Sequence, residues 1–447
     1  MTADLEKLRG SLTGDVLDPG DREYERARLC FNLLIDRRPT AIARCVDAGD
    51  VATALAFAQE NGLEIAVRGG GHNPAGHCAV DDGLVIDLSR MRNVEVDPEA
   101  GIAISGGGAT WLDFDAATQA HGLVTPGGVV GSTGVAGLTL GGGIGHLTAQ
   151  FGLTCDNLIA AELVTPSGEV IRANGHERPE LLWGIRGGGG NFGVATRLKF
   201  RLHPVETVVG GRLNYAGEGV GDAIRAFRDV DARAGNEISI QAQLSTDEDL
   251  NPTLVVVPCY TGSDGDPKEV DALRSAPGLV DDGVRSQGFL DQQRVFDPGY
   301  GVDRNYWKGH FVRELPDELI DELVRRMSAL GRPPGAILLE SLRGAPKDVD
   351  PSTAALGYRD AAFNVSVMAS WVDPADDDAH IAWARETAAA IEPWSLGGGY
   401  ANYMQADEPI ERVRAAYGPD SFDRLRALKS RYDPDNVLRR NQNIPPL

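Results

Sequence analysis

The chain has 447 residues, enough for two or three domains, and its 42% hydrophobic and 24% charged residues are typical of a globular protein. The formal net charge of -22 would repel phosphate backbones and anionic lipids, so we expect neither nucleic acid nor a membrane as a partner. No apolar run approaches the ~20 residues that span a bilayer, and the polar, acidic start lacks the apolar core of a signal peptide, so we expect a cytoplasmic protein.

A charged lead-in, residues 1–37, precedes the first domain, and an apolar stripe through residues 22–35 predicts a helix there. From residue 38 short apolar runs alternate with a helical stretch over residues 51–61. Asp50 is the expected N-cap of that helix and Gly62 the residue just past its end. Strands are expected on both sides, over residues 41–46 and 63–68. The pattern predicts a strand–helix–strand unit.

The rest of the first domain is predicted to be rich in short strands. Thr110 is the expected N-cap of a helix over residues 111–122. A hairpin is expected over residues 158–171, with its turn at Pro166–Gly168. Further strands are expected over residues 84–90, 94–97 and 102–107.

The pattern changes after His203 and Pro204, where strand-like runs alternate with amphipathic helices that begin near Val220 and Pro316. This alternation predicts a second α+β domain with an antiparallel sheet. The predicted organisation is a first domain over residues 38–207, a substrate domain over 208–398, and a C-terminal segment, 399–447, that returns to the first domain.

Glycine accounts for 55 residues, and the excess falls in four clusters of the first domain. Glycine is needed where the backbone takes a positive φ or approaches a ligand closely, and successive bare N–H groups hold anions. Clusters in so many places exceed what turns require, so we expect a site for a long anionic ligand such as a dinucleotide. The clusters are Gly69–Gly71, Gly106–Gly108, the run from Gly127 to Gly145, and Gly187–Gly190.

Two alternative sites are not expected. Residues Gly188–Gly193 match G-x-G-x-x-G, but that motif binds dinucleotides only between a strand and a helix, and the residues that follow alternate as a strand. A Rossmann site for NAD is therefore excluded. His72, His77 and Cys78 include metal-ligand residue types, but no carboxylate or histidine pair at helical spacing accompanies them.

Several segments resemble one known family. "RGGGHNPAGH" (68–77), "TPGGVVGSTGVAGLTLGGGIG" (125–145) and residues 151–171 and 180–200 are similar to the PCMH-type FAD-binding domain of the vanillyl-alcohol-oxidase superfamily, in its berberine-bridge-enzyme-like branch. "YDPDNVLRRNQNIPP" (432–446) resembles the C-terminal signature of that branch. The layout is similar to that of an amine oxidase with one covalent flavin link. The resemblance implies an α+β fold: an FAD-binding domain of two α/β subdomains, plus a substrate domain whose antiparallel sheet is covered by helices.

The resemblance also implies which residues bind FAD. His72 would bond covalently to the 8-methyl carbon of the flavin, which suits a nucleophilic imidazole on a glycine-rich loop, and Arg68 and residues 69–73 would line the pyrophosphate. The implied cofactor-binding residues are Arg68, Gly69, Gly70, Gly71, His72, Asn73, Gly131, Ser132, Thr133, Gly137, Gly141, Gly142, Gly145, Asn191, Val194, Asn441 and Asn443.

A single covalent link is expected. Many members of the branch carry a cysteine ahead of a G-V-x-G segment, and here Gly134–Gly137 places Val130 at that position. Valine cannot form a thioether, and Cys155 lies too far along the chain to replace it. Thr133 stands where the family often has a small aliphatic residue beside the flavin. Because this neighbour influences the access of oxygen, the sequence does not decide whether oxygen or another molecule accepts the electrons.

The catalytic base is the least determined feature. The family often has Glu or Gln on a late strand of the substrate domain, and Ser366 stands at that position, which favours an amine substrate because an amine needs no base. Sugar-oxidising relatives have a Y-x-N-Y segment whose second tyrosine is the base, and Tyr400 and Tyr403 match it. These tyrosines could instead alternate on a strand and only form a wall of the pocket.

The resemblance therefore predicts an FAD-dependent oxidoreductase that takes a hydride from a C–H bond next to nitrogen or oxygen of a small molecule. Within this function, an amine competes with a sugar or other secondary alcohol that would use Tyr403 as base. A protein that binds FAD without turnover is the alternative from another class.

Overall fold

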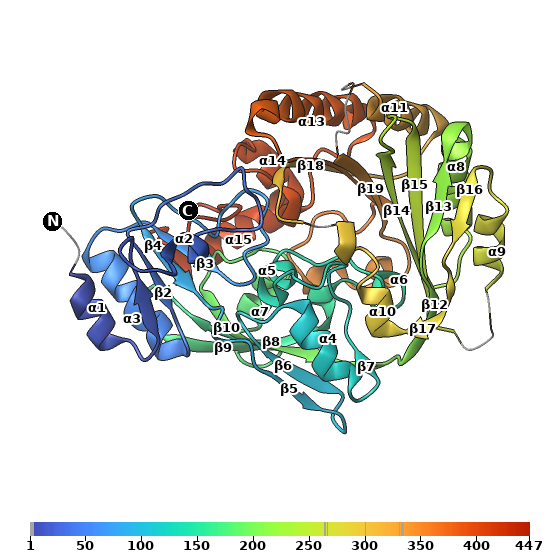
Figure 1. Ribbon diagram of the computed structural model, residues 1–447. Helices are drawn as coiled ribbons and strands as arrows, with labels where there is room; N and C mark the ends of the chain where they lie inside the picture. The colour runs from blue at the N-terminus through green and yellow to red at the C-terminus, as the bar shows by residue number, and fades with distance from the viewer. Residues whose placement is uncertain (1–3, 263–264, 266, 300, 330, 332–334) are drawn as a thin grey trace.

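Two sheets from the first half of the chain and one larger sheet from the second half form the framework of the computed structural model (Figure 1). The structure describes residues 4–262, 265, 267–299, 301–329, 331 and 335–447. Within these ranges, no helix combines the length and the apolar character that crossing a membrane requires.

The first sheet is mainly parallel. Helix α3 (Ala48–Glu60) connects two of its parallel strands, so the predicted strand–helix–strand unit is confirmed. Its strands have the order β1-β2-β4-β3. The lead-in contributes helix α1 (Leu5–Ser11) and strand β1, which pairs antiparallel with β2. The strands are β1 (Asp15–Leu17), β2 (Ala41–Arg44), β3 (Ile65–Arg68) and β4 (Leu84–Asp87).

Two local predictions in this region were wrong. Asp47, not Asp50, caps α3: its side chain accepts a hydrogen bond from the Asp50 N–H. The Asp50 carboxylate instead accepts from the N–H groups of Thr13 and Gly14, at 2.8 and 2.9 Å, and so holds the start of β1. The helix expected over residues 22–35 is one turn, α2 (Tyr24–Ala27), and the residues after it are irregular.

The second sheet is antiparallel, with the order β5-β6-β10-β8-β9. The predicted hairpin is confirmed, and Thr110 caps α4 with a capping box that includes Asp113. The strands are β5 (Val94–Asp97), β6 (Ile102–Gly106), β8 (Leu158–Val164), β9 (Val170–Asn174) and β10 (Val194–Arg201), and a small pair joins β7 (Leu123–Val124) to β11 (His203–Pro204). The helices are α4 (Trp111–Gln119), α5 (Val135–Leu140), α6 (Thr148–Phe151) and α7 (Pro179–Ile185).

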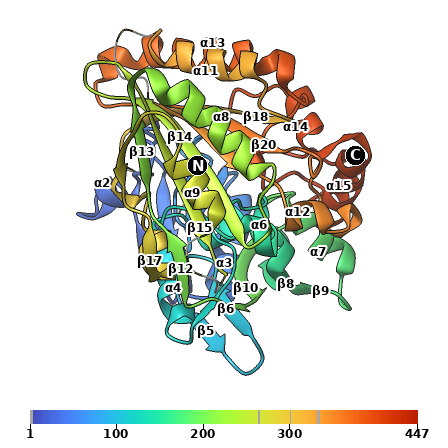
Figure 2. The ribbon, with the colours of Figure 1, turned by 90° about the vertical axis from the view of Figure 1, so that its right-hand side faces the viewer.

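The third sheet is antiparallel, as predicted, and runs β16-β13-β15-β14-β19-β20-β18, while β12 pairs with β15 and β17 pairs with β12. Helices cover its outer face (Figures 1 and 2). The strands are β12 (Thr207–Gly210), β13 (Leu213–Ala216), β14 (Ile238–Thr246), β15 (Pro252–Tyr260), β16 (Leu279–Asp282), β17 (Arg285–Gly288), β18 (Arg304–Val312), β19 (Gly335–Ser341) and β20 (Phe363–Trp371). The helices are α8 (Val220–Asp231), α9 (Lys268–Arg274), α10 (Phe289–Gln293), α11 (Asp317–Met327), α12 (Ala345–Asp348) and α13 (Asp377–Ile391).

The C-terminal segment turns back to the second sheet. Helices α14 (Ile410–Tyr417) and α15 (Pro419–Tyr432) bury Tyr417, Phe422 and Leu425 in the core around that sheet. Burial of such side chains contributes about 1.5–3 kcal/mol each. The last residues then run irregularly beside the first sheet, where Leu438 joins its core.

Candidate active site

The inner face of the third sheet carries polar side chains at a position where three strands meet. Along β20, Val365 and Val367 pack under the helices, so the alternating residues Asn364, Ser366 and Met368 face the other side. Glu340 on β19 lies opposite Asn364 in the ladder and accepts a hydrogen bond from its amide at 2.6 Å. Ser366 therefore lies on the same face of the sheet as Asn364, but it does not line the cavity beside that face.

A cavity lies between this inner face and the glycine-rich loops of the first two sheets. Trp307, Met368 and Tyr403 line it from one side, and glycines from all four clusters line it from the other. The lining glycines are Gly69, Gly70, Gly71, Gly107, Gly128, Gly134, Gly137, Gly141, Gly189, Gly190 and Gly193.

Most, but not all, of the predicted site residues meet in this cavity. Those that line it are Gly69, Gly70, Gly71, His72, Asn73, Thr133, Gly137, Gly141, Val194, Tyr400, Tyr403 and Asn441. Those that do not are Arg68, Gly131, Ser132, Gly142, Gly145, Asn191 and Asn443.

Arg68 and Asn191 have structural roles instead. The Arg68 guanidinium turns away from the cavity and donates to the backbone carbonyls of Ala27 and Arg28. The Asn191 side chain accepts from the Ile444 N–H at 3.1 Å and donates to the Gly188 carbonyl, which ties the last residues of the chain to a glycine cluster. Among the described lining residues, Arg440 is the one arginine or lysine, so it replaces Arg68 as the cation of the cavity.

Two of the glycine clusters touch each other directly. A Cβ atom on Gly70 would lie 2.4 Å from the Gly134 nitrogen, and one on Gly134 would lie 2.5 Å from the Gly70 nitrogen. Neither position leaves room for a side chain. The two loops therefore meet backbone to backbone at the cavity wall, and glycine-rich loops of this kind can bind anions through their N–H groups.

His72 is half-buried and lines the cavity, and its buried Nε2 has no hydrogen-bond partner among the described residues. Burial lowers the pKa of this imidazole to about 4, so the ring is neutral and nucleophilic at neutral pH. His77, which the sequence analysis considered only as a metal ligand, also lines the cavity, and burial lowers its pKa to about 4 as well. The described residues contain no cluster of metal-ligand side chains.

Among the described residues that line the cavity, Cys78 is the one cysteine. Val130 lines the cavity at the position where relatives have a cysteine. Cys155 is fully buried outside the lining, and burial raises the pKa of its thiol. The Cys78 thiol donates to the Gly71 carbonyl at 3.8 Å, and its pKa is raised, first by the neighbouring Cys30 thiol and then by burial.

Tyr403 ends a 3₁₀ turn, Ala401–Tyr403, and Tyr400 directly precedes it, so the two tyrosines do not lie on the strand considered from the sequence. The Tyr400 hydroxyl accepts from the Gly143 N–H at 2.9 Å and from the Asn402 amide, and burial raises the pKa of this phenol. Tyr400 therefore fixes the turn against a glycine loop. Tyr403 donates its hydroxyl hydrogen to Glu340 Oε1 at 3.2 Å.

Glu340 is the functional candidate that the sequence did not identify. The residue is 1% exposed, and burial raises the pKa of its carboxyl to about 7, against smaller lowering effects of its hydrogen bonds to Asn364 and Tyr403. A carboxylic acid that titrates near neutral pH can exchange a proton with its neighbour. The available signal was one acidic residue within the apolar strand sequence "AILLES".

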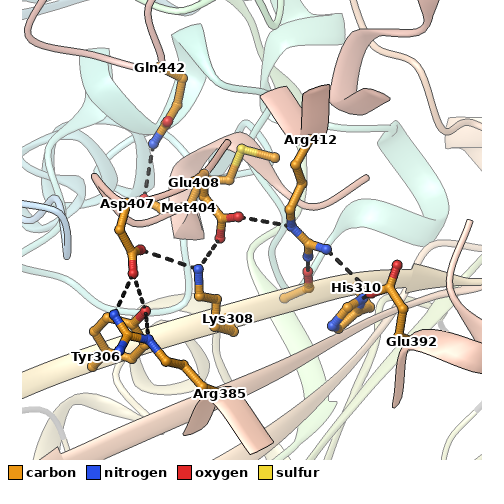
Figure 3. Close-up of polar contacts among 11 residues, drawn as sticks. Tyr306, Lys308, His310, Arg385, Glu392, Met404, Asp407, Glu408, Arg412 and Gln442 are labelled. Carbon is orange, nitrogen blue, oxygen red and sulfur yellow. Dashed lines mark hydrogen bonds and ion pairs between the residues drawn. The ribbon is translucent and has the colours of Figure 1, made fainter. Parts of the chain in front are cut away.

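A network of ion pairs holds the segment after Tyr403 against β18, the edge strand of the third sheet (Figure 3). Asp407 accepts from the Tyr306 hydroxyl at 2.7 Å and pairs with Lys308. Glu408, whose side chain is 3% exposed, lies 2.7 Å from the Lys308 Nζ and 3.1 Å from the Arg412 Nε. These contacts fix the 3₁₀ turn relative to the inner face.

The residues of the cavity suit FAD. Paired glycine loops supply backbone donors, Arg440 supplies positive charge, and apolar residues such as Val67 and Val194 line much of the remaining wall. The unpartnered Nε2 of His72 is available for a covalent bond.

Comparisons with known proteins agree with this fit. The family model of an FAD binding domain matches residues 39–174, and the model described as berberine and berberine like matches residues 399–445. The chain is 30% identical to (R)-6-hydroxynicotine oxidase of Paenarthrobacter nicotinovorans, a match that covers 98% of this chain and 97% of that protein. An FAD-linked oxidoreductase of Dictyostelium discoideum is also 30% identical, with 98% and 96% covered.

Solved structures give the same result. That of 6-hydroxy-D-nicotine oxidase from Arthrobacter nicotinovorans has a TM-score of 0.88 at 30% identity and covers 98% of this chain and 99% of its own. Berberine bridge enzyme from Eschscholzia californica has a TM-score of 0.88 at 22% identity, with 99% of each chain covered, and supports the fold alone. The predicted fold and family are confirmed: the chain belongs to the FAD-linked oxidoreductases of the vanillyl-alcohol-oxidase superfamily, in the berberine-bridge-enzyme-like branch.

Proposed function

We propose that the protein oxidises a small molecule by removing a hydride from a C–H bond next to oxygen or nitrogen, with FAD attached covalently to His72 by a single link. FAD, when bound, supplies the hydride acceptor at its N5 atom. The observation that supports this function best is the hydrogen bond of Tyr403, which lines the cavity, to the buried carboxylate of Glu340 at 3.2 Å.

The Tyr403–Glu340 pair is suited to accept the proton of a substrate hydroxyl. Glu340 has a pKa of about 7, so it is partly ionised at neutral pH and can take the Tyr403 proton while Tyr403 takes one from the substrate. The argument from Ser366 toward amines therefore loses its basis, because a proton acceptor is present on the neighbouring strand. We infer that a sugar or another secondary alcohol is the first substrate class to test.

An amine is the second candidate, and it has its own support. The relative that shares 30% identity over nearly the whole chain is named (R)-6-hydroxynicotine oxidase. A neutral amine can give up a hydride without a base. The aromatic and apolar side chains of Trp307 and Met368 in the cavity would suit a heterocyclic amine.

The test is anaerobic mixing of the purified holoprotein with amines, sugars and aromatic alcohols, with loss of the oxidised flavin absorbance as the readout. We expect at least one class to bleach the flavin. Admission of air afterwards shows whether oxygen or another acceptor takes the electrons. A protein whose flavin is reduced by dithionite but by no compound of these classes would contradict the proposed function.

A further inference from the structure

The residues that replace the predicted helix form a segment that covers the His72 loop. This covering segment, residues 28–35, follows α2 without regular structure. The Phe31 N–H donates to the Gly71 carbonyl at 3.1 Å, next to His72 in the sequence. Arg68, at the start of the same loop, donates to the Arg28 carbonyl at 3.4 Å. The loop and the covering segment are thus bound to each other at several points.

Asn32 also fixes the covering segment to the substrate domain. Its buried amide donates to the carbonyls of Pro74 and Asn305, both at 2.7 Å, and its Oδ1 accepts from the Asn305 N–H at 2.8 Å. Pro74 follows His72 on the loop, and Asn305 lies on β18. One side chain therefore holds the His72 loop, the covering segment and the third sheet in one arrangement.

Phe31 lies directly on the His72 ring. The two ring centroids are 4.0 Å apart and the ring planes differ by 17°, so the rings are stacked. Phe31 also makes an edge-type contact with Trp307, with ring centroids 5.8 Å apart and planes 66° apart. Stacking restrains the plane of the imidazole without occupying its Nε2, which has no hydrogen-bond partner among the described residues.

From these contacts we propose that Phe31 is a positioning residue for covalent flavin attachment: it holds the His72 imidazole in the plane in which the ring nitrogen meets the flavin methyl group. This inference rests on the covalent link in the proposed function. The bond joins an imidazole nitrogen to the 8-methyl carbon. The methyl group loses one hydrogen and the imidazole loses its N–H proton, and the two electrons released pass through the flavin to dioxygen, which becomes hydrogen peroxide.

The experiment compares the fraction of flavin that stays with acid-precipitated polypeptide after the purified protein is incubated with FAD for increasing times. We expect Phe31→Ala and Phe31→Leu to attach flavin on the order of 10²-fold more slowly than the wild type, because small misplacements of reacting groups have effects of that size. Phe31→Tyr keeps the ring and should attach flavin at the wild-type rate. FAD bound without a covalent bond should remain in all variants before acid is added.

A second stacked pair, Phe151 and His203, is a matched control. Its ring centroids are 4.0 Å apart, its ring planes differ by 11°, and it lies outside the cavity lining. Phe151→Ala should leave the rate of attachment unchanged. Leucine at position 31 keeps apolar packing, so this variant tests the ring even where alanine disturbs the fold. Wild-type rates in Phe31→Leu would overturn the positioning role alone. Complete release of flavin from the wild type would instead overturn the His72 link, and the positioning role with it.

Discussion

The Tyr403 hydroxyl and the Glu340 carboxylate are 3.2 Å apart although 63 residues separate them in the sequence. Tyr403 lines the cavity, whereas Glu340 lies behind it in the sheet, almost without exposure. The phenol therefore faces the cavity, and the carboxylate contacts it from the sheet. This hydrogen bond is the reason the proposed function assigns Tyr403 a chemical role and not only a place in the cavity wall.

Removal of the phenolic oxygen tests that role. With a hydroxyl substrate, Tyr403→Phe should lower the first-order rate of flavin reduction by about 10²–10⁴-fold, the usual contribution of general base catalysis. Anaerobic stopped-flow absorbance measures this rate directly. Tyr432→Phe, outside the cavity lining, is the control and should reduce flavin at the wild-type rate. An undiminished rate in Tyr403→Phe would leave the amine mechanism as the better account.

The pH dependence of flavin reduction tests Glu340. Burial raises the pKa of this carboxyl to about 7, and only its ionised form can accept a proton. The rate should therefore rise as the pH increases through about 7 and become constant above it. Glu340→Gln should be slower at every pH and should lose this rise. If the glutamine variant kept the same inflexion, another group would be responsible for it.

Much of the fold follows from local signals in the sequence. Thr110, with Asp113 three residues later, marks the start of α4, and Pro166–Gly168 marks a hairpin turn, because caps and turns depend on neighbours in the chain. The glycine clusters were correctly expected to gather at one site. Asp50 was misplaced because two aspartates near one helix start both fit a cap, and only the contact to residues 13 and 14 separates them.

The features that the sequence could not provide depend on contacts between distant segments. Glu340 becomes a candidate only when Tyr403 lies against it. Residues 28–35 have a helical pattern, but Phe31 and Asn32 find better partners on the His72 loop and on β18, so tertiary contacts prevail over propensity. Arg68 was assigned to the pyrophosphate by family resemblance, yet its guanidinium binds the backbone of that same covering region.

The loops that contain Gly70 and Gly134 are in such close contact that a methyl group added at Gly70 should destabilise the protein. In Gly70→Ala the new Cβ would lie 2.4 Å from the Gly134 nitrogen, so one loop must move. We expect a lower melting temperature and a lower ratio of flavin to protein after purification, measured by calorimetry and absorbance. Gly10→Ala, in α1 and with no atom within 4 Å of the new Cβ, should instead raise stability by about 0.5–1 kcal/mol. Equal behaviour of the two variants would contradict the close contact.

A buried ion pair should anchor the end of the chain. Lys429 and Asp433, both 0% exposed, are 2.6 Å apart, and the Lys429 ammonium also donates to the carbonyls of Asn191 and Leu438. Lys429→Met leaves an unpaired buried carboxylate and should lower the free energy of unfolding by about 3–5 kcal/mol. Lys7→Met removes an exposed partner of Glu60 and should change it by at most about 1 kcal/mol. Similar melting temperatures for both variants would contradict the anchoring role.

The covalent bond between His72 and FAD is the central claim, and peptide mass spectrometry tests it most directly. Digestion of the denatured wild-type protein should yield the peptide that contains His72 with the added mass of FAD less two hydrogens. The His72→Ala protein should release all of its flavin on denaturation and yield the unmodified peptide. Covalent flavin on any other residue, or flavin that stays attached in His72→Ala, would contradict the account.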